Sequence, residues 1–225
     1  LFPYTTLFRS KLITSFSPSR LPSQLNALET WKQHDFDIEA IQCCGETYAL
    51  DIVPNITWVE PNTWWSKKTP SIIDLIDVSE PTLLVNSDIE IRSFNPTNWQ
   101  PEPNVLKIGL RTDYNANHKQ INKYGIDIFL LLPEMREHLR NPLWALGIPG
   151  WDYWLVWKLH KVGYRIQTIT DGIFHEDHKE QWEVTDHQRC LKLLEFEFNQ
   201  SVESISNGLL DLTDRRYLSN RRLKP

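Results

Sequence analysis

The sequence predicts an α/β fold in which a mostly parallel central sheet is flanked by helices. Two observations lead to this prediction. The segment from Lys11 to Ile41 reads as strand, helix and strand within about 30 residues, the size of a βαβ unit. The apolar run Leu83-Leu84-Val85 is continuous rather than alternating, as in a strand covered on both faces. Strands and helices continue to alternate after it, which is the order typical of α/β proteins.

The composition is that of a globular protein with one domain. The chain has 225 residues, 40% of them hydrophobic, which is enough to bury a sizeable core. A formal charge of −5 argues against a nucleic-acid polymer as partner, because such binders need a basic surface. No apolar run reaches about 18 residues, so we expect no membrane span. The three cysteines form no disulfide framework, and we expect reduced thiols in a cytoplasmic protein.

Both ends of the chain are expected to lie outside the folded domain. Residues 1–10 resemble the in-frame translation of a sequencing adaptor and are set aside as an artefact. The domain is predicted over residues 11–205. Residues 206–225 are predicted to be a C-terminal tail, since 211–225 contain five Lys or Arg.

The first strands and helix follow from local pattern. Lys11 to Phe16 is a short apolar strand closed by Ser17-Pro18-Ser19. The apolar residues from Leu21 to Trp31 recur at steps of four, three and three, which predicts an amphipathic helix. Phe36 to Ile41 and Asn55 to Val59 are the next strands. The loop from Ser15 to Arg20 therefore lies at the sheet edge where a helix begins, a place suited to phosphate.

The later elements are predicted in the same way. The sequence indicates a helix over 72–76, irregular chain over 94–103, strands over 105–111 and 124–130, a helix over 153–159, strands over 164–169 and 172–178, and a long helix from Trp182 to about Asn199 that packs on the sheet. Asp127 falls inside an apolar strand, so it needs a partner or a surface edge. The loop from Trp64 to Lys68 combines aromatic and basic residues and is suited to lie over a nucleotide.

Polar side chains follow the apolar run at Leu83. Asn86, Asp88 and Glu90 fall where this strand ends, and ligands of open α/β sheets gather outside the carboxyl ends of strands. In an extended chain, Asp88 and Glu90 would point the same way, and two convergent carboxylates hold a divalent cation. The alternative is that they are only the polar cap of a strand.

Two later segments carry further candidate groups. Gly150-Trp151-Asp152 is a tight turn that opens a helix, where Asp152 is either functional or a capping residue. The strand over 172–178 contains His175 and His178, which are either metal ligands or simply hydrogen-bonded.

In this order, the motifs resemble those of GT-A type glycosyltransferases, the nucleotide-diphospho-sugar transferase superfamily. Asp88-Ile89-Glu90 is similar to the metal-binding Asp-any-Asp motif, with Glu in place of the last Asp. Gly150-Trp151-Asp152 resembles the acidic turn that faces the acceptor, although the usual Glu-Asp pair is here Trp-Asp. His175 matches the late histidine that completes metal coordination. The resemblance extends from Lys11 to about Trp182 and implies a single GT-A-like, Rossmann-like domain.

The resemblance implies a metal-dependent, hexosyltransferase-like enzyme. Such an enzyme moves a sugar from a nucleotide-diphosphate donor to a hydroxyl group of a glycan or another acceptor. Manganese or magnesium held by Asp88, Glu90 and His175 would neutralise the diphosphate. Asp152 would take the acceptor's proton, and its helix N-terminus is expected to keep it ionised. Donor binding is assigned to Ser15, Phe16, Arg20, Glu46 and Asn86.

Other functions remain open on the sequence. A metal-dependent phosphohydrolase would use His175 and His178 with the carboxylates. A non-catalytic carbohydrate-binding domain is suggested by ten Trp residues. A sugar-phosphate nucleotidyltransferase ranks lower, because no Gly-rich basic loop follows the first strand.

Overall fold

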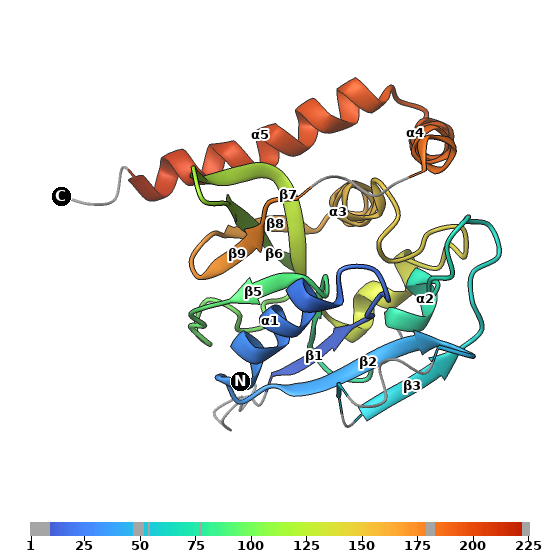
Figure 1. The fold of residues 1–225 in the computed structure, drawn as a ribbon. Coiled ribbons are helices and arrows are strands. Elements are labelled where there is room, and N and C mark those ends of the chain that lie inside the picture. Colours follow the sequence, from blue (N-terminus) through green and yellow to red (C-terminus); the bar gives the residue numbers. More distant parts are fainter. Residues whose placement is uncertain (1–9, 47–51, 54, 77, 179–182, 222–225) are drawn as a thin grey trace.

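The protein folds around one nine-stranded sheet with helices packed on it (Figure 1). The structure, a computed structural model, describes residues 10–46, 52–53, 55–76, 78–178 and 183–221. The strands run in the order β3-β2-β1-β4-β7-β6-β9-β5, and β8 also pairs with β6. Five pairings are parallel (β1 with β2 and β4, β2 with β3, β6 with β8 and β9), whereas β7 pairs antiparallel with β4 and β6, and β5 with β9. The predicted α/β fold with a mostly parallel sheet is therefore confirmed.

The element bounds show how closely local pattern predicts the chain. The strands are β1 Lys11–Thr14, β2 Asp37–Cys43, β3 Asn55–Val59, β4 Thr82–Val85, β5 Ile89–Ile91, β6 Val105–Tyr114, β7 Lys119–Leu131, β8 Arg165–Ile169 and β9 Ile173–Glu176. The helices are α1 Leu21–Lys32, α2 Ile72–Leu75, the short 3₁₀ helix η1 Pro133–His138, α3 Trp151–Lys161, α4 Val184–Phe198 and α5 Val202–Arg221. Residues 1–9, 222–225 and Trp182, which belong to predicted segments, lie outside the described residues.

The N-terminal βαβ unit forms as the apolar spacing requires. β1 and β2 pair in parallel on either side of α1 in the chain, and α1 buries Leu28 and Trp31. The indole Nε1 of Trp31 donates to the backbone oxygen of Ile89 at 2.7 Å, so α1 packs along β5. At the other end of α1, Arg20, the residue before the helix, lies 3.0 Å from Asp88 in the segment that follows β4.

The hairpin of β6 and β7 is longer than the sequence predicted. Its turn is closed by Asn115, whose side-chain oxygen accepts the backbone N–H groups of Asn117 and His118. Because polar Asn residues form such local turns, both strands extend beyond their apolar parts. The extension brings Asp113 into the sheet opposite His175 of β9.

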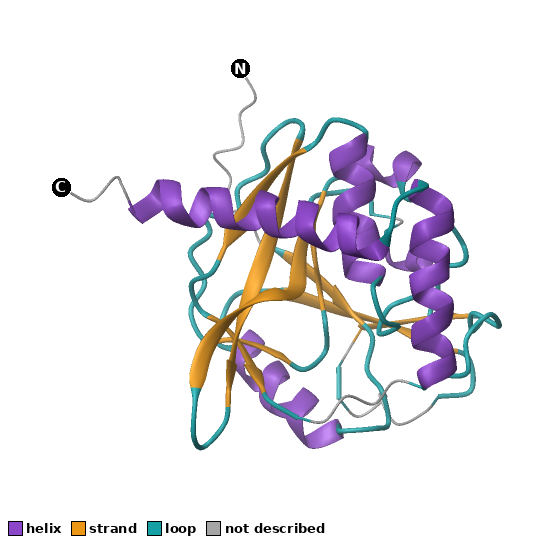
Figure 2. Ribbon diagram, turned by 90° about the horizontal axis from the view of Figure 1, so that it is seen from above, coloured by secondary structure: helices purple, strands orange, loops and turns teal. Residues whose placement is uncertain are grey.

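The C-terminal segment forms two helices, α4 and α5. α5, and not α4, packs against β7, β8 and α3, as Figure 2 shows from above. Ile205 and Leu209 of α5 are buried, whereas Phe196 of α4 is 86% exposed. Thus α5 runs through most of the segment predicted as a tail. In the described part of the chain, no helix combines the length and apolarity that a bilayer crossing requires.

Candidate active site

A cavity of about 630 Å³ opens where β1 and β4 end. The predicted site residues that line it are Ser15, Phe16, Arg20, Asn86, Asp88, Asp152 and His175. They come from the loop after β1, the segment after β4, the first turn of α3, and β9. Lys67 and Lys68 also line the cavity, so the aromatic and basic loop predicted to lie near a nucleotide borders it. Ser66 of this loop is hydrogen-bonded through its backbone N–H and its hydroxyl to Asp186 of α4.

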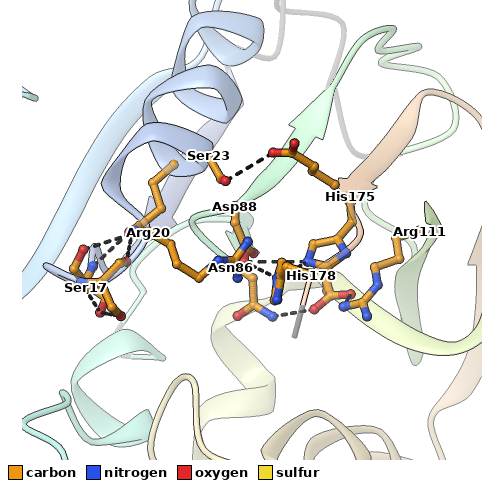
Figure 3. A network of polar contacts seen from close by, with 12 residues as sticks. Ser17, Arg20, Ser23, Asn86, Asp88, Arg111, His175 and His178 are labelled. Carbon is orange, nitrogen blue, oxygen red and sulfur yellow. Dashed lines mark hydrogen bonds and ion pairs between the residues drawn. The ribbon is translucent and has the colours of Figure 1, made fainter. Parts of the chain in front are cut away.

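Asp88, His175 and His178 form the one candidate metal-binding group found among the described residues. One ligand atom from each lies within 4.8 Å of the other two. Asp88 Oδ2 is 3.6 Å from Nε2 of His175 and 3.6 Å from Nε2 of His178, and the two Nε2 atoms are 2.9 Å apart. Figure 3 shows these side chains turned toward one another. Burial opposes the charge of Asp88, but both histidines hold the pKa of its carboxyl far below the usual range.

His175 is fixed by its neighbours on the sheet. Its side chain is 6% exposed, and its Nδ1 lies 3.1 Å from Asp113 Oδ1. Burial works against the charged ring, but hydrogen bonds to Asp113 and Asp88 raise the pKa of His175 to about 9. His178 follows β9 and is 28% exposed, so it is the more accessible of the two histidines.

Arg20 joins the loop after β1 to this group. It is the residue preceding α1 and adopts a left-handed backbone conformation with φ of 64°, which L-residues other than Asn and Asp rarely adopt. Its Nη1 lies 3.0 Å from Asp88 Oδ2. The loop itself is held by two buried amides. Gln42 accepts the backbone N–H of Phe16, and Gln24 accepts that of Ser17. The site loop is therefore organised before any ligand binds.

Asp152 lies in the first turn of α3, but it is not the helix cap. Gly150 occupies the cap position, and no side chain caps the helix there. Burial and the nearby Asp127 raise the pKa of Asp152 to about 7, even though backbone N–H groups favour its ionised form. The expectation that the helix N-terminus keeps Asp152 fully ionised is thus wrong, because desolvation outweighs the helix. A carboxyl with a pKa near neutrality is suited to exchange protons.

Two predicted site residues lie elsewhere. Glu90 accepts hydrogen bonds from Arg92 Nε at 2.6 Å and from the Tyr114 hydroxyl, and it does not belong to the metal-binding group. Asp88 and Glu90 were expected to point the same way, as alternate residues of an extended strand do. Asp88 instead lies in a turn, which is closed by the 3.2 Å hydrogen bond from Ile89 N to Asn86 O. Glu46 does not line the cavity. Its carboxylate accepts the N–H of Cys43 in its own turn.

The structure adds residues that the sequence did not single out. Asp113 contacts His175, and Arg111 bridges Asp113 and Asp127 with distances of 2.7 and 2.9 Å. Asn86 donates to Asp127 from the other side, which supplies the partners that a buried Asp127 needs. One sequence feature could have identified Arg111 and Asp113. They are two residues apart at the end of an apolar strand, so their side chains lie on the same face of the sheet.

Comparisons with known proteins return structures of similar fold. No family model matches the chain, and no curated protein matches it. Among solved structures, an active-site mutant of LgtC is 10% identical with a TM-score of 0.49, over 82% of this chain and 95% of that one. The glycosyltransferase GlyE of Streptococcus pneumoniae TIGR4 is 9% identical with a TM-score of 0.45, over 88% of this chain and 64% of that one. At such identities and scores, function has to be inferred from the geometry of the site.

Proposed function

We propose that this protein is a metal-dependent glycosyltransferase that moves a sugar from a nucleotide-diphosphate donor to a hydroxyl acceptor. The observation that carries the proposal is the placement of two kinds of group in one cavity. Asp88, His175 and His178 form a candidate cation site, and Asp152 supplies a carboxyl whose pKa is near neutrality. A group transfer from a diphosphate needs both, since negative charge grows on the leaving group while the acceptor loses a proton.

The residues present fit a divalent cation. One carboxylate and two imidazoles suit zinc or iron, and they suit manganese better than magnesium, which prefers oxygen ligands alone. A cation bound there would neutralise the diphosphate of the donor. Arg20, Lys67 and Lys68 line the same cavity and supply further positive charge for the phosphates. The loop of Ser15 and Phe16 would bind the nucleoside. Asn86, at the end of β4, would also contact the donor.

Asp152 is assigned to the acceptor. Its carboxyl would accept the hydroxyl proton as the new glycosidic bond forms. Asp127 tunes this group, because its charge disfavours a second charge on Asp152 and so raises the pKa of Asp152. A base with a pKa near the working pH accepts a proton more readily than an ordinary carboxylate.

The pair of histidines also favours a second candidate, a metal-dependent phosphohydrolase. Two imidazoles and one carboxylate are a common catalytic ligand set for metals that activate water. This enzyme would cleave activated phosphate esters without any sugar acceptor. The two candidates therefore differ in whether an acceptor is required.

Calorimetry with nucleoside diphosphates tests the proposal. We expect the wild-type chain to bind at least one nucleoside diphosphate in Mn²⁺, to lose binding in EDTA, and to lose it in Asp88→Asn. Hydrolysis of p-nitrophenyl phosphate without an acceptor would instead support the phosphohydrolase. Glycan binding that neither chelation nor Asp88→Asn affects would support a non-catalytic carbohydrate-binding domain.

A further inference from the structure

We propose that Asp113 is a positioning residue for the cation site: it orients His175 so that Nε2 faces Asp88, and Arg111 holds Asp113 in place. This inference rests on the cation site proposed above. It concerns residues of β6 that would not touch the cation themselves.

The orientation follows from the pairing of β6 with β9. Asp113 and His175 lie opposite each other in the register of these strands, and His175 Nδ1 is 3.1 Å from Asp113 Oδ1. An ionised carboxylate only accepts hydrogen bonds, so the hydrogen of the ring lies on Nδ1. When the ring is neutral, as a metal ligand must be, its lone pair therefore lies on Nε2, the atom 3.6 Å from Asp88 Oδ2. A histidine ligand with this arrangement is both oriented and made more basic by its carboxylate partner.

Asp113 is itself held on both oxygens. Arg111 Nε donates to Oδ1 at 2.7 Å, and the Asn122 amide donates to Oδ2. Arg111 Nη1 reaches Asp127 Oδ2 at 2.9 Å, so the guanidinium is fixed between two carboxylates. Asp113 therefore cannot turn toward the cation without breaking these bonds. It acts as a fixed acceptor for His175.

Room for this network is made by a glycine on the neighbouring strand. A Cβ atom at Gly125 of β7 would lie 2.7 Å from Arg111 Nε and 2.8 Å from Arg111 Cγ. The Arg111 side chain thus packs directly on the backbone of Gly125, and its guanidinium reaches Asp113.

A purely structural role would give different results. If Asp113 only stabilised the hairpin through Arg111, its loss would lower the free energy of unfolding and leave the Mn²⁺ affinity of the folded protein unchanged. If it acted only through its charge, any carboxylate in the cavity wall would matter equally. Asp177 offers the matched comparison, because it lines the same cavity and contacts Asn115 and His118 instead of His175.

Mn²⁺ titration calorimetry of the full chain, without nucleotide, separates these cases. We expect Asp113→Asn to weaken Mn²⁺ binding by about 10- to 100-fold, and Asp177→Asn to weaken it clearly less. Wild-type affinity in Asp113→Asn, or equal losses in the two variants, would overturn the positioning role while leaving the cation site intact. A wild-type chain that binds no Mn²⁺ would overturn the positioning role and the proposed function together.

A second measurement needs no variant and so stands even if Asp113→Asn does not fold. In ¹⁵N-histidine NMR spectra of the wild-type chain loaded with diamagnetic Zn²⁺, we expect His175 to keep its hydrogen on Nδ1 and to coordinate through Nε2. Coordination through Nδ1 would overturn the proposal.

Discussion

Replacing Asp152 by Asn should stabilise the protein above neutral pH while it removes activity. The pKa of Asp152 rises from 3.8 to about 7 on folding, because burial and Asp127 disfavour the charge. The carboxyl therefore favours the folded state only while it is protonated, and its contribution is lost as pH rises from about 4 through about 7. At about 1.4 kcal/mol for each pKa unit, the ionised group costs the folded protein about 4 kcal/mol.

Urea unfolding followed by Trp fluorescence at pH 4, 6 and 8 measures this difference. We expect Asp152→Asn to exceed the wild type in free energy of unfolding by less than about 1 kcal/mol at pH 4 and by about 4 kcal/mol at pH 8. Asp171→Asn, at an exposed position, is the control for the loss of a carboxyl in general. If the wild type and Asp152→Asn differ by the same amount at all three pH values, the raised pKa is refuted.

The same variant tests the assigned role in transfer. Loss of a general base lowers the rate by about 100- to 10,000-fold. Greater stability together with lower activity is expected for a functional group that lowers the stability of the folded protein. A variant that is more stable and fully active would show that Asp152 has a raised pKa without serving as the base.

Three further results are expected. His175→Ala should weaken Mn²⁺ binding more than His178→Ala in calorimetry, because His175 is buried and oriented by a carboxylate, whereas His178 is more exposed; the reverse order would contradict this assignment. Glu90→Gln should leave Mn²⁺ affinity unchanged in the same assay, since its carboxylate faces other partners, and a loss like that of His175→Ala would restore the metal role predicted from sequence. Gly125→Ala should lower the free energy of unfolding by about 1–3 kcal/mol through overpacking, as measured in urea, because its Cβ would meet Arg111; unchanged stability would show that the Arg111 side chain moves aside freely.

Local pattern predicted the strands and helices that carry the site. The strand-end rule placed Asp88 and the loop of Arg20 at one sheet edge, and the 3.0 Å ion pair between them confirms that these segments meet. His175 also lies where its strand was expected to bring it. These successes share a cause, since each follows from the direction of a strand and the side on which it ends.

What the sequence could not predict depends on the environment of single side chains. Glu90 was assigned by the alternation of an extended chain, but the turn at Asp88 breaks that alternation. The pKa of Asp152 is determined by burial and by Asp127, which is distant in sequence. Asp113 gains its role only through the pairing of β6 with β9, a contact between strands that no local pattern encodes.

In the proposed enzyme, the ion pair of Arg20 and Asp88 would couple the binding of the cation to that of the donor. Without a cation, the guanidinium of Arg20 lies 3.0 Å from Asp88 Oδ2 and offsets part of the charge of the carboxylate. If Asp88 held a cation, its ion pair with Arg20 would weaken, and Arg20 would be able to contact the diphosphate. By thermodynamic linkage, the donor must then raise the affinity for the cation by the same factor as the cation raises the affinity for the donor. A site built in this way would bind each ligand more tightly when the other is present.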